Sequence, residues 1–193
     1  LDSEGFRHED YSLYPVHVDT WGGFVFICLD DPPRKPLAQF VAAEAALVSS
    51  WPLADLRVAY RETFPLACNW KIFWENYNEC YHCARVHPEL CELMPVYKRG
   101  VFDDADLPGW EPRHPGDEGL GRVGNGHATW TPDGQIRLPV IPGPTAEEIA
   151  SGVVFATITP SLYVVAHPDY VRSVRVLPKG PEQTELVVDW LLP

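Results

Sequence analysis

Four strand-like runs follow one another at the C-terminal end of the sequence, with short connections between them. They cover residues 153–159, 162–166, 170–177 and 184–192. The last connection, 178–181 (PKGP), has the proline and glycine that favour a turn. Strands joined this closely pair in antiparallel fashion, because a parallel crossover needs a dozen or more residues. The chain is therefore limited to folds built around an antiparallel sheet.

Helices are indicated at three places outside these runs. The signals are an alanine-rich stretch at 37–48, a cap at Asn69 for a helix over 70–81, and a capping box at 145–148 (TAEE). Gly152 is expected to end the last helix. Helices that accompany an antiparallel sheet in this way predict an α+β fold.

The N-terminal part of the chain predicts two strands, a linker and a further strand. Residues 11–30 contain two strand-like runs around a turn at 19–23, and the continuous apolar run 24–29 is typical of a strand buried on both faces. The proline-rich stretch 31–36 predicts a linker, and residues 57–66 alternate as a strand does.

Turn residues dominate the middle of the chain. Residues 103–126 are rich in Asp, Gly and Pro and predict a loop. The sequence PDG at 132–134 predicts a hairpin turn within 127–138.

Composition argues against several classes of protein. The net charge of −12 repels phosphate backbones, so we expect no nucleic-acid partner. No apolar run approaches the ~20 residues of a membrane span. Four of the five cysteines lie within 68–91 with no signal peptide before them, which argues against a disulfide framework and favours the cytoplasm. Because the chain starts at Leu1 and ends in an apolar run at Pro193, we expect a piece of a longer protein.

Two stripes of side chains share the helix expected over 70–81. An aromatic stripe, typical of a core-facing side, consists of Trp70, Trp74, Tyr77 and Tyr81. A polar stripe on another side consists of Glu75, Glu79 and His82, with Asn78 beside them. Because a polar stripe is most often a solvated helix face, it does not establish a site by itself.

His87 follows His82 at a spacing that an unbroken helix would not bring together, because five positions turn the helix by roughly 140° from an aligned position. Pro88 disfavours the helical conformation in the residue before it, so the helix should break near Val86 and let His87 swing back. Two imidazoles and a carboxylate can hold ferrous iron with positions open for oxygen and substrate. Glu79, one turn before His82, could hydrogen-bond the far N–H of that imidazole.

The same segment also offers the ligands of a zinc knuckle. They are Cys80, Cys83, His87 and Cys91. Spacing alone favours zinc and iron equally, so a zinc-binding, non-catalytic interaction module remains an alternative.

The string N-W-K-x3-E-N-x2-E-C-Y-H-C-x3-H-P-E-L at 69–90 closely resembles the iron-binding signature of Rieske-type non-haem iron ring-hydroxylating oxygenase large subunits. It is most similar to the branch that acts on glycine betaine, choline and carnitine. Residues 13–30 also resemble the end of the family's Rieske domain, and 167–171 and 177–181 resemble strands of its catalytic domain.

This resemblance implies a division of the chain into domains. Residues 1–36 would be the end of the Rieske domain and a linker, and 37–193 an incomplete catalytic domain of the helix-grip (START-like) type. The family's long C-terminal helix and its third iron ligand, an Asp, are expected beyond Pro193. Asp169 and Asp189 fall in strand-like segments and are poor candidates for that ligand.

The resemblance also assigns roles to single residues. His82 and His87 match the two iron-ligating histidines. Glu79 matches the carboxylate that connects a cluster-ligating histidine of the neighbouring subunit to His82, which is the electron entry route. Asn76 matches a residue near the iron.

The implied reaction is the insertion of oxygen from O2 into a C–H bond of a small organic substrate, by mono- or dioxygenation. Hydroxylation of a quaternary ammonium N-methyl group would lead to demethylation. The implied cofactors are mononuclear Fe(II) and an upstream [2Fe-2S] Rieske cluster reduced by NAD(P)H through a reductase or ferredoxin. The implied assembly is a homotrimer, and these 193 residues alone are expected to be inactive. A helix-grip domain that only binds a small molecule is a further alternative.

Overall fold

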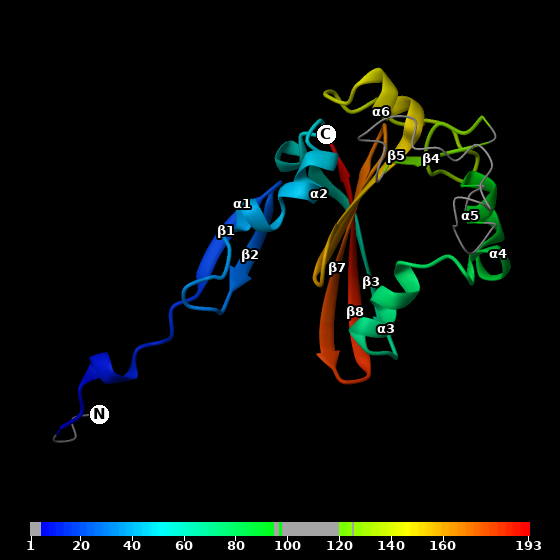
Figure 1. The fold of residues 1–193 in the computed structure, drawn as a ribbon. Coiled ribbons are helices and arrows are strands. Elements are labelled where there is room, and N and C mark those ends of the chain that lie inside the picture. Colours follow the sequence, from blue (N-terminus) through cyan, green and yellow to red (C-terminus); the bar gives the residue numbers. More distant parts are fainter. Residues whose placement is uncertain (1–4, 95–96, 98–119, 125) are drawn as a thin grey trace.

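A six-stranded antiparallel sheet forms the centre of the computed structural model, which describes residues 5–94, 97, 120–124 and 126–193 (Figure 1). Its strand order is β3-β8-β7-β6-β5-β4. The strands are β3 (Arg57–Leu66), β4 (Leu120–Arg122), β5 (Gly152–Ile158), β6 (Leu162–Ala166), β7 (Val171–Gly180) and β8 (Gln183–Leu192). The four predicted C-terminal strands and the strand at 57–66 are confirmed. The loop predicted over 103–126 is wrong at β4, and its residues 103–119 and 125 lie outside the described part.

Short helices flank the sheet. They are α1 (Leu37–Phe40), α2 (Ala42–Leu47), α3 (Trp70–Tyr77), α4 (Cys83–Val86), α5 (Pro88–Leu93) and α6 (Ala146–Ser151), with 3-10 turns η1 (His8–Tyr11) and η2 (Leu53–Asp55). The capping box of α6 and its end at Gly152 in left-handed geometry are confirmed. The single helix predicted over 37–48 is wrong, because Val41 leaves helical geometry between α1 and α2 and buries its side chain completely.

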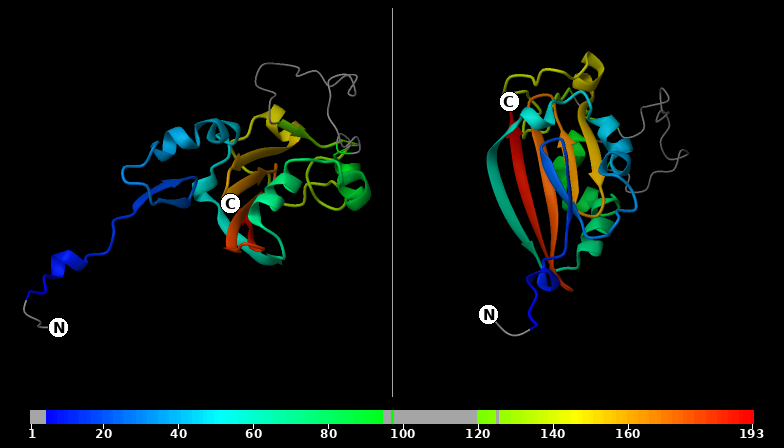
Figure 2. Two further views of the ribbon diagram at one scale, coloured as in Figure 1. Left: turned by 60° about the horizontal axis from the view of Figure 1, so that its bottom comes forward. Right: turned by 90° about the vertical axis from the view of Figure 1, so that its left-hand side faces the viewer.

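The core consists of two apolar clusters, one on each face of the sheet. Alternate residues of a strand point to opposite faces, so β5 sends Val154 to one cluster and Val153 to the other. Figure 2 shows α1 and α2 on one side of the sheet and α3, α4 and α5 on the other. The α+β prediction is confirmed, and the long C-terminal helix of a helix-grip fold remains a prediction.

The N-terminal strands β1 (His17–Trp21) and β2 (Phe24–Cys28) form a separate two-stranded hairpin, as predicted. The turn predicted at 19–23 is confined to Gly22 and Gly23, because 19–21 are paired residues of β1. Only one of its faces, which carries Trp21, Phe24 and Phe26, packs against the core. The prediction that β2 is buried on both faces is wrong, because Val25 and Ile27 on its other face are exposed at 69% and 67%.

The segment 127–138 has no strand, so the predicted hairpin is wrong. Only its turn is present: the N–H of Gly134 donates to the carbonyl of Thr131 at 3.0 Å. Gly134 has φ +68° and lies so close to His127 that a Cβ would be 2.3 Å from the ring. Within the described ranges, no helix has the length and apolar character needed to cross a bilayer.

Candidate metal centre

Three short helices, α3, α4 and α5, bring the predicted metal ligands to one face of the sheet. The predicted cap is confirmed, since the Asn69 side chain accepts from the N–H of Lys71 at 2.9 Å. The predicted break is confirmed too: α4 ends at Val86, and α5 begins at Pro88. His87 lies between them with φ −129° and ψ 60°, outside helical geometry, as proline requires of the residue before it.

The helix α3 ends at Tyr77, earlier than predicted, and this divides the aromatic stripe. Trp74 is only 4% exposed, and the ring centre of Tyr77 lies 4.2 Å from that of Tyr163 on β6. The prediction that Tyr81 faces the core is wrong, because Tyr81 lies beyond the helix end and is 81% exposed.

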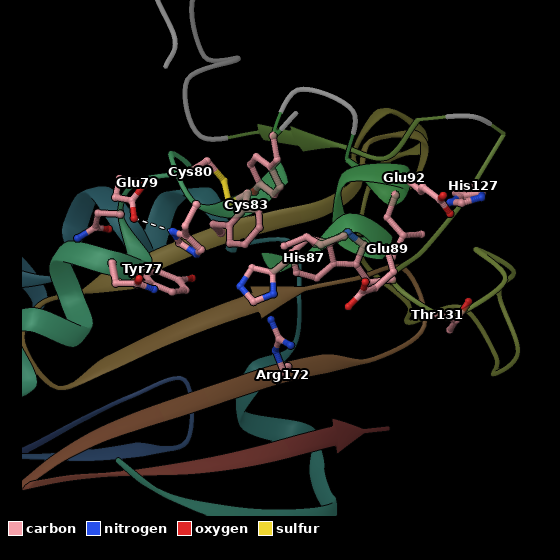
Figure 3. A pocket seen from close by; sticks show the side chains of 18 of the residues that line it. Tyr77, Glu79, Cys80, Cys83, His87, Glu89, Glu92, His127, Thr131 and Arg172 are labelled. Carbon is pink, nitrogen blue, oxygen red and sulfur yellow. Dashed lines mark hydrogen bonds and ion pairs between the residues drawn. A yellow bond between two sulfur atoms is a disulfide. The ribbon is translucent and has the colours of Figure 1, made fainter. Parts of the chain in front are cut away.

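His82 and His87 lie together, which supports the prediction that both serve one site. Their ring centres are 5.2 Å apart and their planes are inclined by 78°. Both line a cavity of about 810 Å³ between the helical segment and the sheet, which Figure 3 shows from close by. Asn76 lines the same cavity from the last turn of α3.

Glu79 contacts His82 directly, although it lies outside a helix. Its Oε1 is 2.6 Å from Nδ1 of His82, and its other carboxylate oxygen accepts from the backbone N–H of Tyr81. The hydrogen bond with His82 is the main cause that lowers the pKa of the Glu79 carboxyl below its usual value. An ionised Glu79 favours the tautomer in which Nδ1–H donates, and this leaves Nε2 of His82 for a metal.

The two histidines suit a borderline metal such as iron, but the described residues assemble no larger ligand set. No group of three His, Cys, Asp or Glu side chains in the described ranges could hold a metal ion. Asp189 is engaged by Arg61 at 2.5 Å, and Asp169 accepts from Thr129 at 2.8 Å. Both aspartates are therefore poor candidates, as expected.

The zinc knuckle is wrong for this structure. Cys80 and Cys83 form a disulfide across their three-residue separation, so their sulfur atoms are bonded to each other rather than open to zinc. This single disulfide is not the framework that the sequence argued against, because Cys28, Cys68 and Cys91 form no disulfide.

The sheet supplies the opposite wall of the cavity, which the sequence motif did not indicate. This wall includes Phe155 and Thr157 of β5, Arg172 of β7, and Trp130 and Tyr170 from connecting segments. The hydroxyl of Tyr170 donates to the carbonyl of Trp130 at 2.7 Å, which ties these two segments together. Arg172 is a basic residue in a largely apolar stretch, but Arg175 follows on the same strand, so the sequence alone did not single out Arg172.

His167 is buried behind this wall. Its ring centre lies 4.3 Å from that of Tyr170, and the planes are nearly parallel. Burial, aided by the positive charge of Arg172, lowers the pKa of His167 to about 3. His167 is therefore neutral at physiological pH and is not a lining residue of the cavity.

The fold and the cavity define an α+β domain with a candidate metal centre between its sheet and its helices. The chain belongs to the ring-hydroxylating oxygenase family, because the family model described as "Ring hydroxylating alpha subunit (catalytic domain)" matches residues 53–193.

Individual relatives agree with this family. The glycine betaine monooxygenase oxygenase subunit of Chromohalobacter salexigens is 28% identical over 98% of this chain and 46% of its own length. The chloroplastic choline monooxygenase of Beta vulgaris is 24% identical over 99% of this chain and 39% of its own. The quaternary ammonium Rieske monooxygenase CntA in complex with L-carnitine has the same fold, with a TM-score of 0.54 at 19% identity over 98% of this chain and 44% of its own. The chain spans less than half of the length of each of these proteins.

Proposed function

We propose that this chain is the catalytic part of an oxygenase subunit that hydroxylates a small organic substrate at a mononuclear non-haem Fe(II), with His82 and His87 as two of its ligands. The observation that supports this best is the placement of both imidazoles on one cavity, with Nδ1 of His82 bound to Glu79. Iron of this kind supplies the activation of O2 when bound. The third ligand is expected to be an Asp outside these 193 residues.

We infer that Glu79 has two roles. It fixes the tautomer and the orientation of His82 through the 2.6 Å hydrogen bond, and its half-exposed side chain would be accessible to a neighbouring subunit. Such a position suits the electron path from a [2Fe-2S] Rieske cluster that NAD(P)H reduces through a reductase or ferredoxin. Asn76 lines the same cavity and is assigned a supporting role near the iron.

The domain division and the assembly are part of the same proposal. Residues 1–36, which include the separate β1–β2 hairpin, would be the end of the Rieske domain and a linker, and 37–193 would form the catalytic domain. A homotrimer would bring the cluster of one subunit to Glu79 of the next. The cytoplasm is the expected compartment.

The substrate class is inferred from the relatives and from the cavity wall. The relatives act, by their names, on glycine betaine and choline, and CntA binds L-carnitine. Aromatic side chains that line the cavity, such as Tyr77 of α3 and Phe155 of β5, can attract a quaternary ammonium group. Hydroxylation of one N-methyl group consumes O2, two electrons and two protons, yields water and a hemiaminal, and the hemiaminal then releases formaldehyde.

The test is metal analysis of the full-length protein. His82→Ala or His87→Ala should remove the mononuclear iron and leave the Rieske cluster, seen by its visible absorption and electron paramagnetic resonance, intact. His127→Ala is the matched control, because His127 lines the same cavity but lies away from His87 (Figure 3). Retention of full mononuclear iron and turnover in both ligand variants would refute the assignment.

A further inference from the structure

Arg172 places a positive charge in the wall of the cavity that faces the histidines. Its side chain leaves β7 on the same face of the sheet as Val174 and Val176 and points toward the side of the cavity on which His87 lies (Figure 3). Its guanidinium carbon is 5.5 Å from the ring centre of Trp130. Glu79, Glu89 and Glu92 line the helical wall, so the cavity is acidic there and cationic at Arg172 on its sheet wall.

The described residues leave the guanidinium of Arg172 without an acidic partner. Its Nε is buried and has no hydrogen-bond partner among them, and none of their ion pairs includes Arg172. By contrast, Arg175, three positions along the strand, lies 3.8 Å from Asp189 on the other face of the sheet. A partly buried guanidinium with free donors is a preformed site for a carboxylate, which it binds through two parallel hydrogen bonds.

The aromatic surroundings of Arg172 increase its attraction for an anion. The rings of Tyr77, Tyr163, His167 and Tyr170 lie near enough for Arg172 to lower the pKa of each, which opposes the larger effect of burial on the three tyrosines. Few water molecules can solvate the guanidinium within such an aromatic layer, so an anion that reaches it gains more than it would at an exposed arginine. Aromatic rings beside the guanidinium provide apolar faces for the remainder of the ligand.

We propose that Arg172 binds a carboxylate of the substrate, so that the protein acts on quaternary ammonium carboxylates rather than on quaternary ammonium alcohols. This inference rests on the proposed function and narrows its substrate class. One end of a betaine would be held by Arg172, and its N-methyl groups would then lie toward His82 and His87. Choline has a hydroxyl in place of the carboxylate and would leave the guanidinium unpaired.

The experiment compares glycine betaine with choline on the full-length, iron-loaded protein, by binding calorimetry and by the KM of substrate-dependent oxygen consumption. The two probes share the trimethylammonium group and differ at the opposite end. Wild-type protein should bind glycine betaine at least about 10-fold more tightly than choline, since a hydrogen bond between charged groups accounts for roughly 10- to 100-fold in affinity. Arg172→Met should abolish this preference, because it should lower the affinity for glycine betaine and leave the affinity for choline unchanged.

Two further variants make the result specific. Arg172→Lys keeps the charge without the two-pronged geometry and should retain part of the preference. Arg175→Met removes the same charge from the opposite face of the same strand and should leave the preference unchanged. If Arg172→Met does not fold, as judged by its thermal melt, Arg172→Lys decides, and an unaltered preference in that variant overturns the inference.

Iron content, measured on the same samples, separates this inference from the proposed function. Wild-type protein that holds mononuclear iron but binds neither probe, binds choline as well as glycine betaine, or keeps its preference in Arg172→Met leaves the proposed function standing and refutes the role of Arg172. Wild-type protein that binds no mononuclear iron refutes the proposed function itself.

Discussion

Trp74 anchors the helix that precedes the proposed metal ligands, and its removal should destabilise the domain and the site together. Its side chain is 4% exposed, packs edge-on against Tyr77 and Tyr163, and donates from Nε1 to the carbonyl of Pro160 at 2.7 Å. Trp74→Ala should cost about 3–5 kcal/mol, because it leaves a large cavity and an unpaired carbonyl. That loss is a large fraction of the 5–15 kcal/mol typical of a folded domain.

The assay is thermal unfolding of the full-length protein followed by circular dichroism, with iron content measured on the folded fraction. Trp74→Ala should lower the melting temperature by on the order of 10 °C and reduce iron retention. Trp74→Phe keeps most of the packing and loses one hydrogen bond, so about 1 kcal/mol is expected.

Tyr81→Ala is the control, because Tyr81 belongs to the same aromatic spacing in the sequence but is exposed. It should change stability by no more than about 0.5 kcal/mol. Equal destabilisation by Trp74→Ala and Tyr81→Ala would show that the helix continues past Tyr77 and that the packing argument is wrong.

Two further predictions concern single titratable groups. Glu79→Gln should keep iron and substrate binding but lose most NAD(P)H-coupled turnover, because a neutral amide binds His82 less strongly and cannot provide the carboxylate of the electron path; wild-type turnover in this variant would contradict the bridging role. His167 has a pKa of about 3 in the folded protein against 6.5 normally, so the unfolded chain binds the extra proton and stability should fall as pH decreases from about 6.5 toward 3. His167→Gln should lose part of this dependence, seen as a smaller shift of the urea midpoint between pH 7.5 and 5, and an identical shift in both proteins would rule out a buried neutral His167.

Local signals predicted the half of the site that lies on one continuous segment. The cap at Asn69 and the break before Pro88 both act within a few residues of the chain, so their effects could be read directly from the sequence. The end of α3 at Tyr77 could not, because no glycine or proline marks it. The continued helix put Tyr81 in the core wrongly, and it put Glu79 beside His82 correctly but by the wrong geometry, since a turn rather than a helix brings them together.

Tertiary packing determined the features that the sequence did not predict. The apolar run of β2 has the pattern of a strand buried on both faces. The hairpin, however, packs only one of its two faces against the core, so Val25 and Ile27 on the other face are exposed. The sheet wall of the cavity depends on which strands pair. The period-two pattern of β7 places Arg172 on the face of Val174, but only the assembled sheet places that face opposite the histidines.

In the proposed function, the helical wall of the cavity supports the reaction and the sheet wall selects the substrate. His82 and His87, as the proposed metal ligands, and Glu79, which binds His82, would support the same chemistry for any substrate with an oxidisable C–H bond. Discrimination between substrates would then come from groups that touch the remainder of the molecule. On the sheet wall, Arg172 is the only arginine or lysine among the described lining residues. We therefore expect the differences between betaine and choline oxygenases to lie at residue 172 and at its neighbours across the cavity, rather than among the proposed metal ligands.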